Sequence, residues 1–168
     1  IDELPPGRRP VITRLFNAGQ KEYIYRAIAE ETKKGRQVYV VYPVIDETEK
    51  TNLKSAIIGK EALEKIFPKL KVDLIHGRLK PQERENIMAS FKKGEIDLLV
   101  STTVIEVGVD VPNAAMMLIV HAERFGLSQL HQLRGRVGRG GSQSYCFLLM
   151  YEPVSEDARR RLDIMIKS

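Results

Sequence analysis

The run VYVVYPVI at residues 38–45 consists almost entirely of apolar and β-branched side chains. A strand with one wet face alternates apolar and polar residues, whereas a strand buried on both faces is apolar throughout. The run therefore predicts a strand of a parallel sheet that helices cover on both sides. Three further runs have the same character: IDLLVST (96–102), MMLIVH (116–121) and SYCFLLMY (144–151).

Segments with helical periodicity lie between the predicted strands, and this alternation favours a parallel sheet covered by helices. We therefore expect an α/β domain of three layers, with a mostly parallel central sheet and helices on both faces. Weaker runs predict an edge strand at 11–16 and a short strand at 72–76, and the polar stretch 46–55 predicts a loop. Helices are expected over residues 20–34, over residues 57–67, from Pro81 to Gly94, and around Leu127, Leu130 and Leu133.

The composition is that of an ordinary globular protein. The chain has 168 residues, of which 43% are hydrophobic and 29% are charged, enough for one domain with a sizeable core. No apolar run approaches the ~18–20 residues needed to cross a bilayer, so we expect no membrane partner. The net charge of +5 favours a partner with a phosphate backbone, although many domains without such a partner share it.

Cysteine and histidine usage points away from disulfides and metal sites. Cys146 is the only cysteine, which excludes an internal disulfide and fits a reducing cytoplasm. Its place in the apolar run CFLLM predicts a buried thiol. His76, His121 and His131 lack metal-ligand spacing and cysteine partners. We therefore expect a cytoplasmic protein without a metal site in this chain.

The segment QLRGRVGR at 132–139 is the strongest chemical pattern. It places Arg136 and Arg139 three residues apart, each next to a glycine. Glycine keeps side-chain bulk away, so a large anion can approach the backbone. Guanidinium groups are always charged and present planar donor forks that suit phosphate oxygens. The pattern predicts a site for a phosphoryl group, and a basic turn after a helix is the alternative.

Two strand ends carry further polar and glycine residues. In LLVSTTVIEVGVDVPNA (98–114), Thr102 and Thr103 can donate to a phosphate, Gly108 permits a tight turn, and Asp110 can accept from a ribose hydroxyl. Ligands of open α/β sheets bind at the carboxyl ends of strands, and this segment starts at such an end. An ordinary transition from strand to loop remains the alternative.

The segment LIHGRLKPQER (74–84) has the same plan of strand end, glycine, basic residues and helix start. Free N–H groups and partial positive charge at a helix start can hold a phosphate. Gly77 permits close approach, and Arg78 or Lys80 adds charge. The hydrophobic strand before Asp46 and Glu47 imitates a magnesium-binding strand, but no G-x-x-x-x-G-K-[ST] loop occurs in the chain. We therefore interpret those two carboxylates as part of a solvated loop.

Together these segments resemble the second RecA-like lobe of superfamily-2 helicases. QLRGRVGR resembles the Q-x-x-G-R-x-G-R element of that superfamily, STTVIEVGVD resembles the element before it, and HGRLKPQER resembles a nucleic-acid loop. The match keeps its order over about residues 36–150. More narrowly, LPPGR, IHGRLKP and FGLSQLHQLRGRVGRG are similar to the RecG family of branched-DNA translocases.

The resemblance implies roles in ATP hydrolysis. Arg136 and Arg139 would be arginine fingers, Gln132 would help to sense the γ-phosphate, and Gly108 and Asp110 would touch the nucleotide. ATP and Mg²⁺ would be held mainly by a preceding lobe of the same protein, which carries the phosphate loop. This chain would complete the site across the cleft.

The resemblance also implies a DNA track and a division of the chain. Thr102, Gly77 and Arg78 would contact branched or forked DNA, as in fork reversal and Holliday-junction remodelling, and the protein would act as a monomer. Residues 1–19 would be the connector from the preceding lobe, residues 20–152 the second RecA-like domain, and residues 153–168 the start of a C-terminal helical extension that is cut short.

Several alternatives stay open. The transcription-repair coupling factor shares much of the FGLxQLHQLRGRVGR region and is the nearest rival. A lobe of an RNA helicase and a non-catalytic nucleic-acid-binding RecA-like module use the same fold. A hydrolase built on Ser128, His131 and Asp110 lacks a nucleophile-elbow motif. The missing phosphate loop predicts that this chain alone hydrolyses no ATP.

Overall fold

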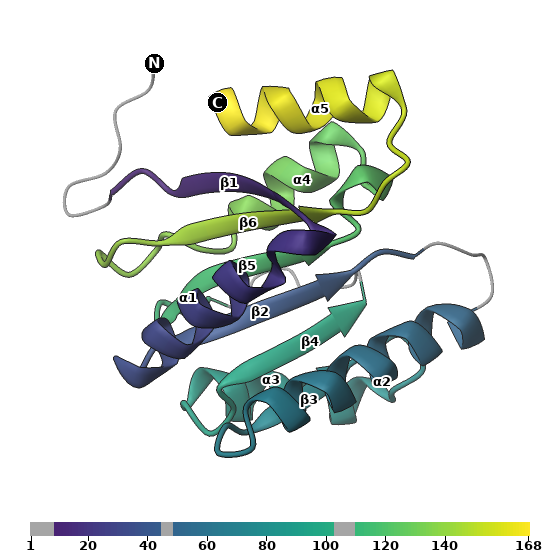
Figure 1. The fold of residues 1–168 in the computed structure, drawn as a ribbon. Helices are drawn as coiled ribbons and strands as arrows, with labels where there is room; N and C mark the ends of the chain where they lie inside the picture. The colour runs from purple at the N-terminus through teal and green to yellow at the C-terminus, as the bar shows by residue number, and fades with distance from the viewer. Residues whose placement is uncertain (1–8, 45–48, 103–109) are drawn as a thin grey trace.

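The computed structural model describes residues 9–44, 49–102 and 110–168. Within these ranges six strands form one sheet in the order β1-β6-β5-β2-β4-β3, and every neighbouring pair is parallel (Figure 1). The strands are β1 (Ile12–Asn17), β2 (Gln37–Tyr42), β3 (Val72–Ile75), β4 (Leu98–Thr102), β5 (Ala114–Val120) and β6 (Tyr145–Met150).

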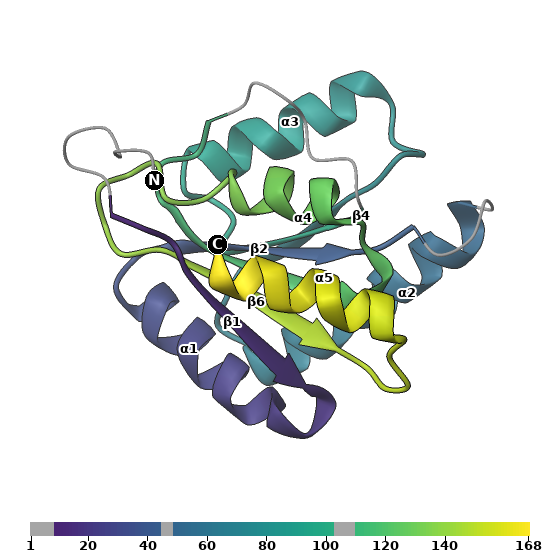
Figure 2. The ribbon, with the colours of Figure 1, turned by 90° about the horizontal axis from the view of Figure 1, so that it is seen from above.

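Helices cover both faces of the sheet. Helices α1 and α2 lie on one face, and α3, α4 and α5 lie on the other (Figures 1 and 2). The predicted three-layer α/β architecture is therefore confirmed. The bounds are α1 (Lys21–Lys33), α2 (Glu49–Ile66), α3 (Pro81–Lys92), α4 (Leu127–Arg134) and α5 (Glu156–Lys167), with short 3-10 turns η1 (Ala18–Gln20) and η2 (Ala122–Arg124).

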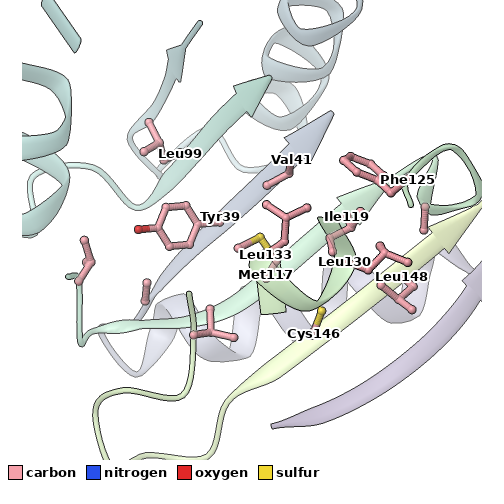
Figure 3. Close-up of a cluster of buried hydrophobic side chains, with 14 of the residues drawn as sticks. Tyr39, Val41, Leu99, Met117, Ile119, Phe125, Leu130, Leu133, Cys146 and Leu148 are labelled. Carbon is pink, nitrogen blue, oxygen red and sulfur yellow. The ribbon is translucent and has the colours of Figure 1, made fainter. Parts of the chain in front are cut away.

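Strand β2 shows why the sequence run is apolar throughout. Alternate side chains of a strand point to opposite faces. Tyr39 and Val41 pack with α3, α4 and α5, and Val38 and Val40 pack with α1 and α2; each of the four is at most 1% exposed. Figure 3 shows the first of these two cores, where β2, β4, β5 and β6 meet α4. Because helices cover both faces of β2, neither face is exposed to solvent, where a polar residue would be favoured.

Strand β1 occupies an edge of the sheet, as predicted. Its register with β6 runs from Ile12 opposite Tyr145 to Asn17 opposite Met150. Only β6 borders it within the sheet. The segment 12–17 thus contributes a full strand to the domain.

The predicted loop at 46–55 is wrong from residue 49 onward, because α2 begins at Glu49. Asn52 is 4% exposed, Ala56 is buried and Leu63 is 5% exposed. These positions are spaced by four and seven residues, which places them on one face of a helix. The helix was missed because a polar residue, Asn52, occupies a buried position on that face and interrupts the apolar pattern.

The C-terminal helix α5 begins with a side-chain cap. The Ser155 hydroxyl accepts a hydrogen bond from the Ala158 amide at 3.1 Å, which caps the first turn. Leu162 and Met165 are fully buried against the sheet and α4, whereas Ile166 is 37% exposed. Leu162 and Met165 therefore form the buried face of α5, and Ile166 lies outside it.

Candidate functional site

The carboxyl edge of the sheet brings together the residues predicted to contact DNA. Thr102 is the last residue of β4 and is 6% exposed. In the register of β3 with β4, Ile75 lies opposite Ser101. Gly77 and Arg78, which follow β3 and are exposed, therefore lie beside the end of β4. Neighbouring parallel strands end at the same edge, which explains the grouping.

Hydrogen bonds hold the loop after β3. The Arg78 amide donates to Nδ1 of His76 at 3.2 Å. Nη1 of Arg84 donates to the carbonyl oxygens of Gly77 at 3.5 Å and Leu79 at 3.2 Å. Arg84 was not predicted as part of the site, because no pattern in the sequence pairs it with these carbonyls. Its charge reinforces the positive field around Arg78.

The start of α3 is less available to an anion than the sequence suggested. Pro81 occupies the first turn, as predicted, and has no N–H group. The Lys80 amide donates to Oε1 of Glu83 at 3.0 Å. One donor of the helix start is therefore engaged within the protein, and a carboxylate stands next to it. Arg78 and Lys80 remain the cationic groups of this loop.

The segment QLRGRVGR (residues 132–139), called the arginine segment from here on, lies at the opposite, amino edge of the sheet. Helix α4 returns from the carboxyl end of β5, and the segment leads from it to the amino end of β6 (Figure 1). The Arg136 amide donates to the Leu133 carbonyl at 3.0 Å, which continues the helix by a tight turn. Gly138 then adopts φ 84°, a conformation that side chains other than glycine rarely take.

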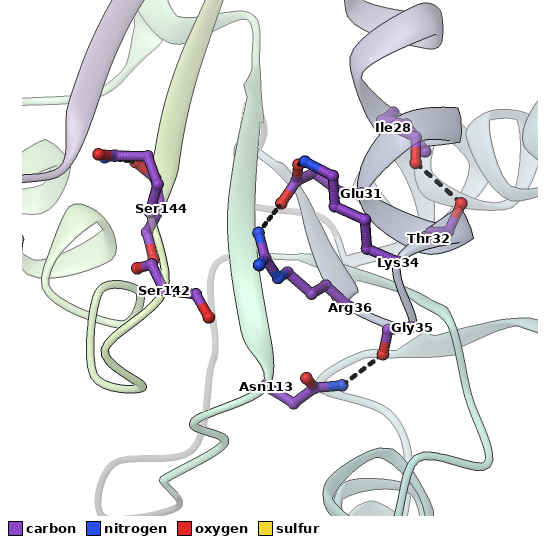
Figure 4. Close-up of polar contacts among 10 residues, drawn as sticks. Ile28, Glu31, Thr32, Lys34, Gly35, Arg36, Asn113, Ser142 and Ser144 are labelled. Carbon is purple, nitrogen blue, oxygen red and sulfur yellow. Dashed lines mark hydrogen bonds and ion pairs between the residues drawn. The ribbon is translucent and has the colours of Figure 1, made fainter.

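The segment before β5 packs against the arginine segment. The Pro112 carbonyl oxygen lies directly against Gly140. Nδ2 of Asn113 donates to the Gly35 carbonyl at 2.8 Å (Figure 4) and to Oε1 of Gln37 at 3.1 Å. Residues 110–113 are thereby fixed to the loop between α1 and β2. They support the arginine segment through the close approach of Pro112 to Gly140.

Two charged side chains meet at this support. Nε of Arg139 donates to the Gly135 carbonyl at 3.1 Å and lies 3.9 Å from Oδ1 of Asp110. The Arg139 side chain is 45% exposed and that of Asp110 is 52% exposed. A loose, half-exposed ion pair of this kind contributes little to stability. The guanidinium group is held in place and stays accessible from solvent.

Tyr39 of β2 is buried in the core on the same face of the sheet as the arginine segment. Burial raises the pKa of Tyr39 to about 12, while the charges of Arg136 and Arg139 lower it and the charge of Asp110 raises it. All three groups therefore act on one hydroxyl beneath the arginine segment. Tyr39 was not predicted as part of this site, since its only sequence signal was that of a buried strand.

Asp110 and Thr102 lie at opposite edges of the sheet, although both belong to the segment 98–114. The chain crosses from the carboxyl end of β4 at Thr102 to the amino end of β5 at Ala114, which carries Asp110 to the other edge. Gln132, the first residue of the arginine segment, is exposed on α4. Gly108 lies outside the described residues. The candidate residues thus form two groups, one at each edge.

No set of three or more His, Cys, Asp or Glu side chains in residues 9–44, 49–102 and 110–168 is placed to hold a metal ion. In these same ranges, no helix has the length and apolarity that a membrane span requires. The chemistry of the described site rests on guanidinium, hydroxyl and backbone groups.

The family model, the most similar relatives and the solved structures all point to helicases. Residues 19–141 match the family described as the helicase conserved C-terminal domain. The chain is 54% identical to the ATP-dependent DNA helicase RecG of Synechocystis sp., with 100% of this chain and 20% of the relative covered. A solved structure of RecG bound to a three-way DNA junction is 47% identical, with a TM-score of 0.83, and the match covers 98% of this chain and 21% of that one.

More distant structures share the fold alone. The C-terminal domain of S. cerevisiae Dbp5 superposes with a TM-score of 0.63 at 17% identity, over 95% of this chain and 84% of that domain. The chain spans about a fifth of the RecG relative from Synechocystis. The predicted resemblance to RecG helicases and the RecA-like lobe architecture are both confirmed. The chain belongs to the helicase conserved C-terminal domain family.

Proposed function

We propose that this chain is the second motor lobe of an ATP-dependent DNA helicase that acts on branched DNA in recombination and repair. The proposal rests on the ion pair of Arg139 with Asp110 and on Arg136, which lies on the turn that continues α4. The 47% identity to a RecG that was solved on a three-way DNA junction supports branched DNA as the substrate.

The arginine group fits a nucleotide phosphate. Arg139 is half exposed and, among the described residues, makes its contacts through Nε. Its two terminal nitrogens therefore suit phosphate oxygens. Gln132 would join Arg136 at the γ-phosphate, and Asp110 and Gly108 would meet the rest of the nucleotide. ATP supplies the energy of phosphoryl transfer, with Mg²⁺ and the phosphate loop assigned to the preceding lobe.

The role of the arginines is electrostatic. Charge spreads over the transferring phosphoryl group, and fixed cations that face it lower the barrier. Thr102, Gly77 and Arg78 would hold the DNA backbone at the other edge. One connection joins Thr102 to Asp110. Closure and opening of the two lobes therefore shift both groups together, which couples hydrolysis to movement along DNA.

Substitution of the arginines in the complete protein tests the proposal. Arg136→Ala and Arg139→Ala should each lower kcat for ATP by about 10³-fold or more and change KM little, since the charge acts on the transition state. Arg160→Ala on α5 removes an exposed cation and is the control. A raised KM with kcat unchanged would assign these arginines to ground-state binding instead.

The DNA partner is tested by stimulation of ATP turnover. Forked DNA should stimulate more strongly than linear duplex DNA or duplex RNA of equal length. Stronger stimulation by duplex RNA would favour an RNA helicase lobe instead. A nucleic-acid affinity that ATP leaves unchanged would favour a binding module. We assign the protein to the cytoplasm, where a bacterial RecG would meet chromosomal DNA.

A further inference from the structure

A cavity of about 320 Å³ opens between α1, α2 and the sheet, on the face away from the arginine segment. It lies at the carboxyl ends of β2, β5 and β6. Aliphatic side chains of these strands and of both helices form its floor. Polar and aromatic groups gather around it: Lys21, Tyr25, Tyr42, Ser55, His121 and Tyr151.

One wall of the cavity is a stack of rings with a cation. The His121 ring stacks on Tyr151, with the centroids 4.1 Å apart and the planes at 29°. The Lys21 ammonium lies 5.2 Å from the centroid of Tyr151. A hydrogen bond with the Tyr151 side chain raises the pKa of Lys21 above its ordinary value. The ammonium is therefore charged at neutral pH.

The backbone and a buried carboxylate hold this wall. His121 adopts φ 54° and ψ 50°, a left-handed conformation that is costly for a residue with a side chain. Glu123 accepts from the Tyr151 amide at 3.0 Å, and its other oxygen lies 3.2 Å from Nδ1 of His121. The Glu123 side chain is 9% exposed. Glu123 thereby fixes both rings of the stack.

The opposite side of the cavity depends on Gly59. Its Cα lies so close to the Tyr42 hydroxyl that a Cβ would collide with the ring. Burial raises the pKa of Tyr42 to about 12, so its hydroxyl keeps its proton and can donate a hydrogen bond. Tyr42 lies opposite Thr102 in the register of β2 with β4. The cavity therefore adjoins the proposed DNA surface.

We propose that this cavity binds a nucleotide, with the base among the tyrosines and aliphatic floor and the phosphate on Lys21. Nucleobases stack on aromatic side chains and need hydrogen-bonding groups at their edges. The hydroxyls of Tyr42 and Ser55 supply such groups. The nucleotide comes either from the bound DNA strand or from the free pool. This site is separate from Arg136, Arg139 and Asp110 and requires none of these residues.

Mononucleotide binding to the 168-residue chain tests the proposal, with calorimetry as the measurement. Deoxyadenosine monophosphate should bind at least about tenfold more tightly than deoxyribose 5-phosphate, which has no base. Ser55→Phe fills the cavity and should abolish binding, and Lys21→Gln should weaken it about tenfold. Arg26→Gln on α1 and Glu61→Phe on α2 change exposed positions and should leave binding unchanged.

Thermal unfolding of each variant separates loss of binding from loss of folding. A well-folded Ser55→Phe variant that binds deoxyadenosine monophosphate like the parent chain would overturn the proposal. The proposal would also be overturned if the parent chain neither bound deoxyadenosine monophosphate nor distinguished a single strand with one adenine from the same strand with one abasic position.

Single strands with one adenine or one abasic position identify the source of the nucleotide. If the base comes from DNA, Ser55→Phe weakens binding of the adenine strand and not of the abasic strand. If the nucleotide is free, Ser55→Phe weakens only mononucleotide binding. These results are independent of ATP turnover in the arginine variants, so this proposal and the motor function can fail separately.

Discussion

Gly140 lies against the Pro112 carbonyl oxygen with no room for a side chain between them. The contact is with backbone, which cannot rotate away as the end of a long side chain can. Pro112 precedes Asn113, whose amide group ties this segment to Gly35. The position of the arginine segment therefore depends on the absence of one methyl group.

Gly140→Ala should destabilise the chain by about 1–3 kcal/mol, because the added methyl group forces the segment away from Pro112. Urea unfolding at neutral pH measures the loss. Gly135→Ala is the matched control. Gly135 has φ −65°, and a Cβ there would meet its nearest neighbour at 3.4 Å, an ordinary contact. Equal stability of the two variants would contradict the predicted clash.

At the level of elements, Arg134 joins α4 to α5 and β1. Its Nη1 donates to the Met165 carbonyl at 3.0 Å and to the Thr13 hydroxyl at 3.2 Å. Arg161 of α5 in turn donates to the carbonyls of Phe125 at 3.2 Å and Glu123 at 3.1 Å. Helix α5 is thus bound at its middle and near its C-terminal end to the layer that carries the arginine segment.

Arg134→Met should loosen the C-terminal turn of α5, because methionine keeps the length and loses the charged donors. Hydrogen bonds to charged groups contribute about 1.5–3 kcal/mol. Amide exchange in the last turn of α5 should therefore speed up by about tenfold or more. Arg160→Met, on the exposed side of the same helix, should change exchange little. Unchanged protection in Arg134→Met would show that apolar packing alone holds α5.

At the level of the whole molecule, the two cores bury groups that ionise in alkali. Burial raises the pKa of Cys146 to about 12 from an ordinary value of 9.0. Burial also raises the pKa of Tyr39 and of Tyr42 to about 12 from 10.0. Above pH 9 the unfolded chain loses these protons first, while the folded chain retains them. Ionisation therefore favours the unfolded state.

The free energy of unfolding should fall as the pH rises from about 9 to 12. Below pH 9 these three groups add no pH dependence, because both states hold their protons. Urea unfolding between pH 8 and pH 11 measures the slope. Tyr42→Phe removes one of the groups and should make the slope shallower. A slope equal to that of the parent chain would show that Tyr42 ionises without unfolding.

The sequence predicted which segments form strands and helices better than it predicted which residues lie together in space. Runs of apolar residues identified β2, β4, β5 and β6, because both faces of these strands are buried. The start of α2 was missed, because Asn52 is buried there and breaks the apolar pattern. The residues of the arginine segment were identified from their chemistry, and their roles remain predictions.

The local pattern alone determined that the chain is an α/β domain and that Arg136 and Arg139 stand on a glycine-spaced segment. Both properties depend on residues near each other in the chain. Only the tertiary structure decided that Asp110 lies with Arg139 and apart from Thr102. The connection between two parallel strands must return from the carboxyl end of one strand to the amino end of the next. Residues close in sequence therefore lie at opposite edges of the sheet.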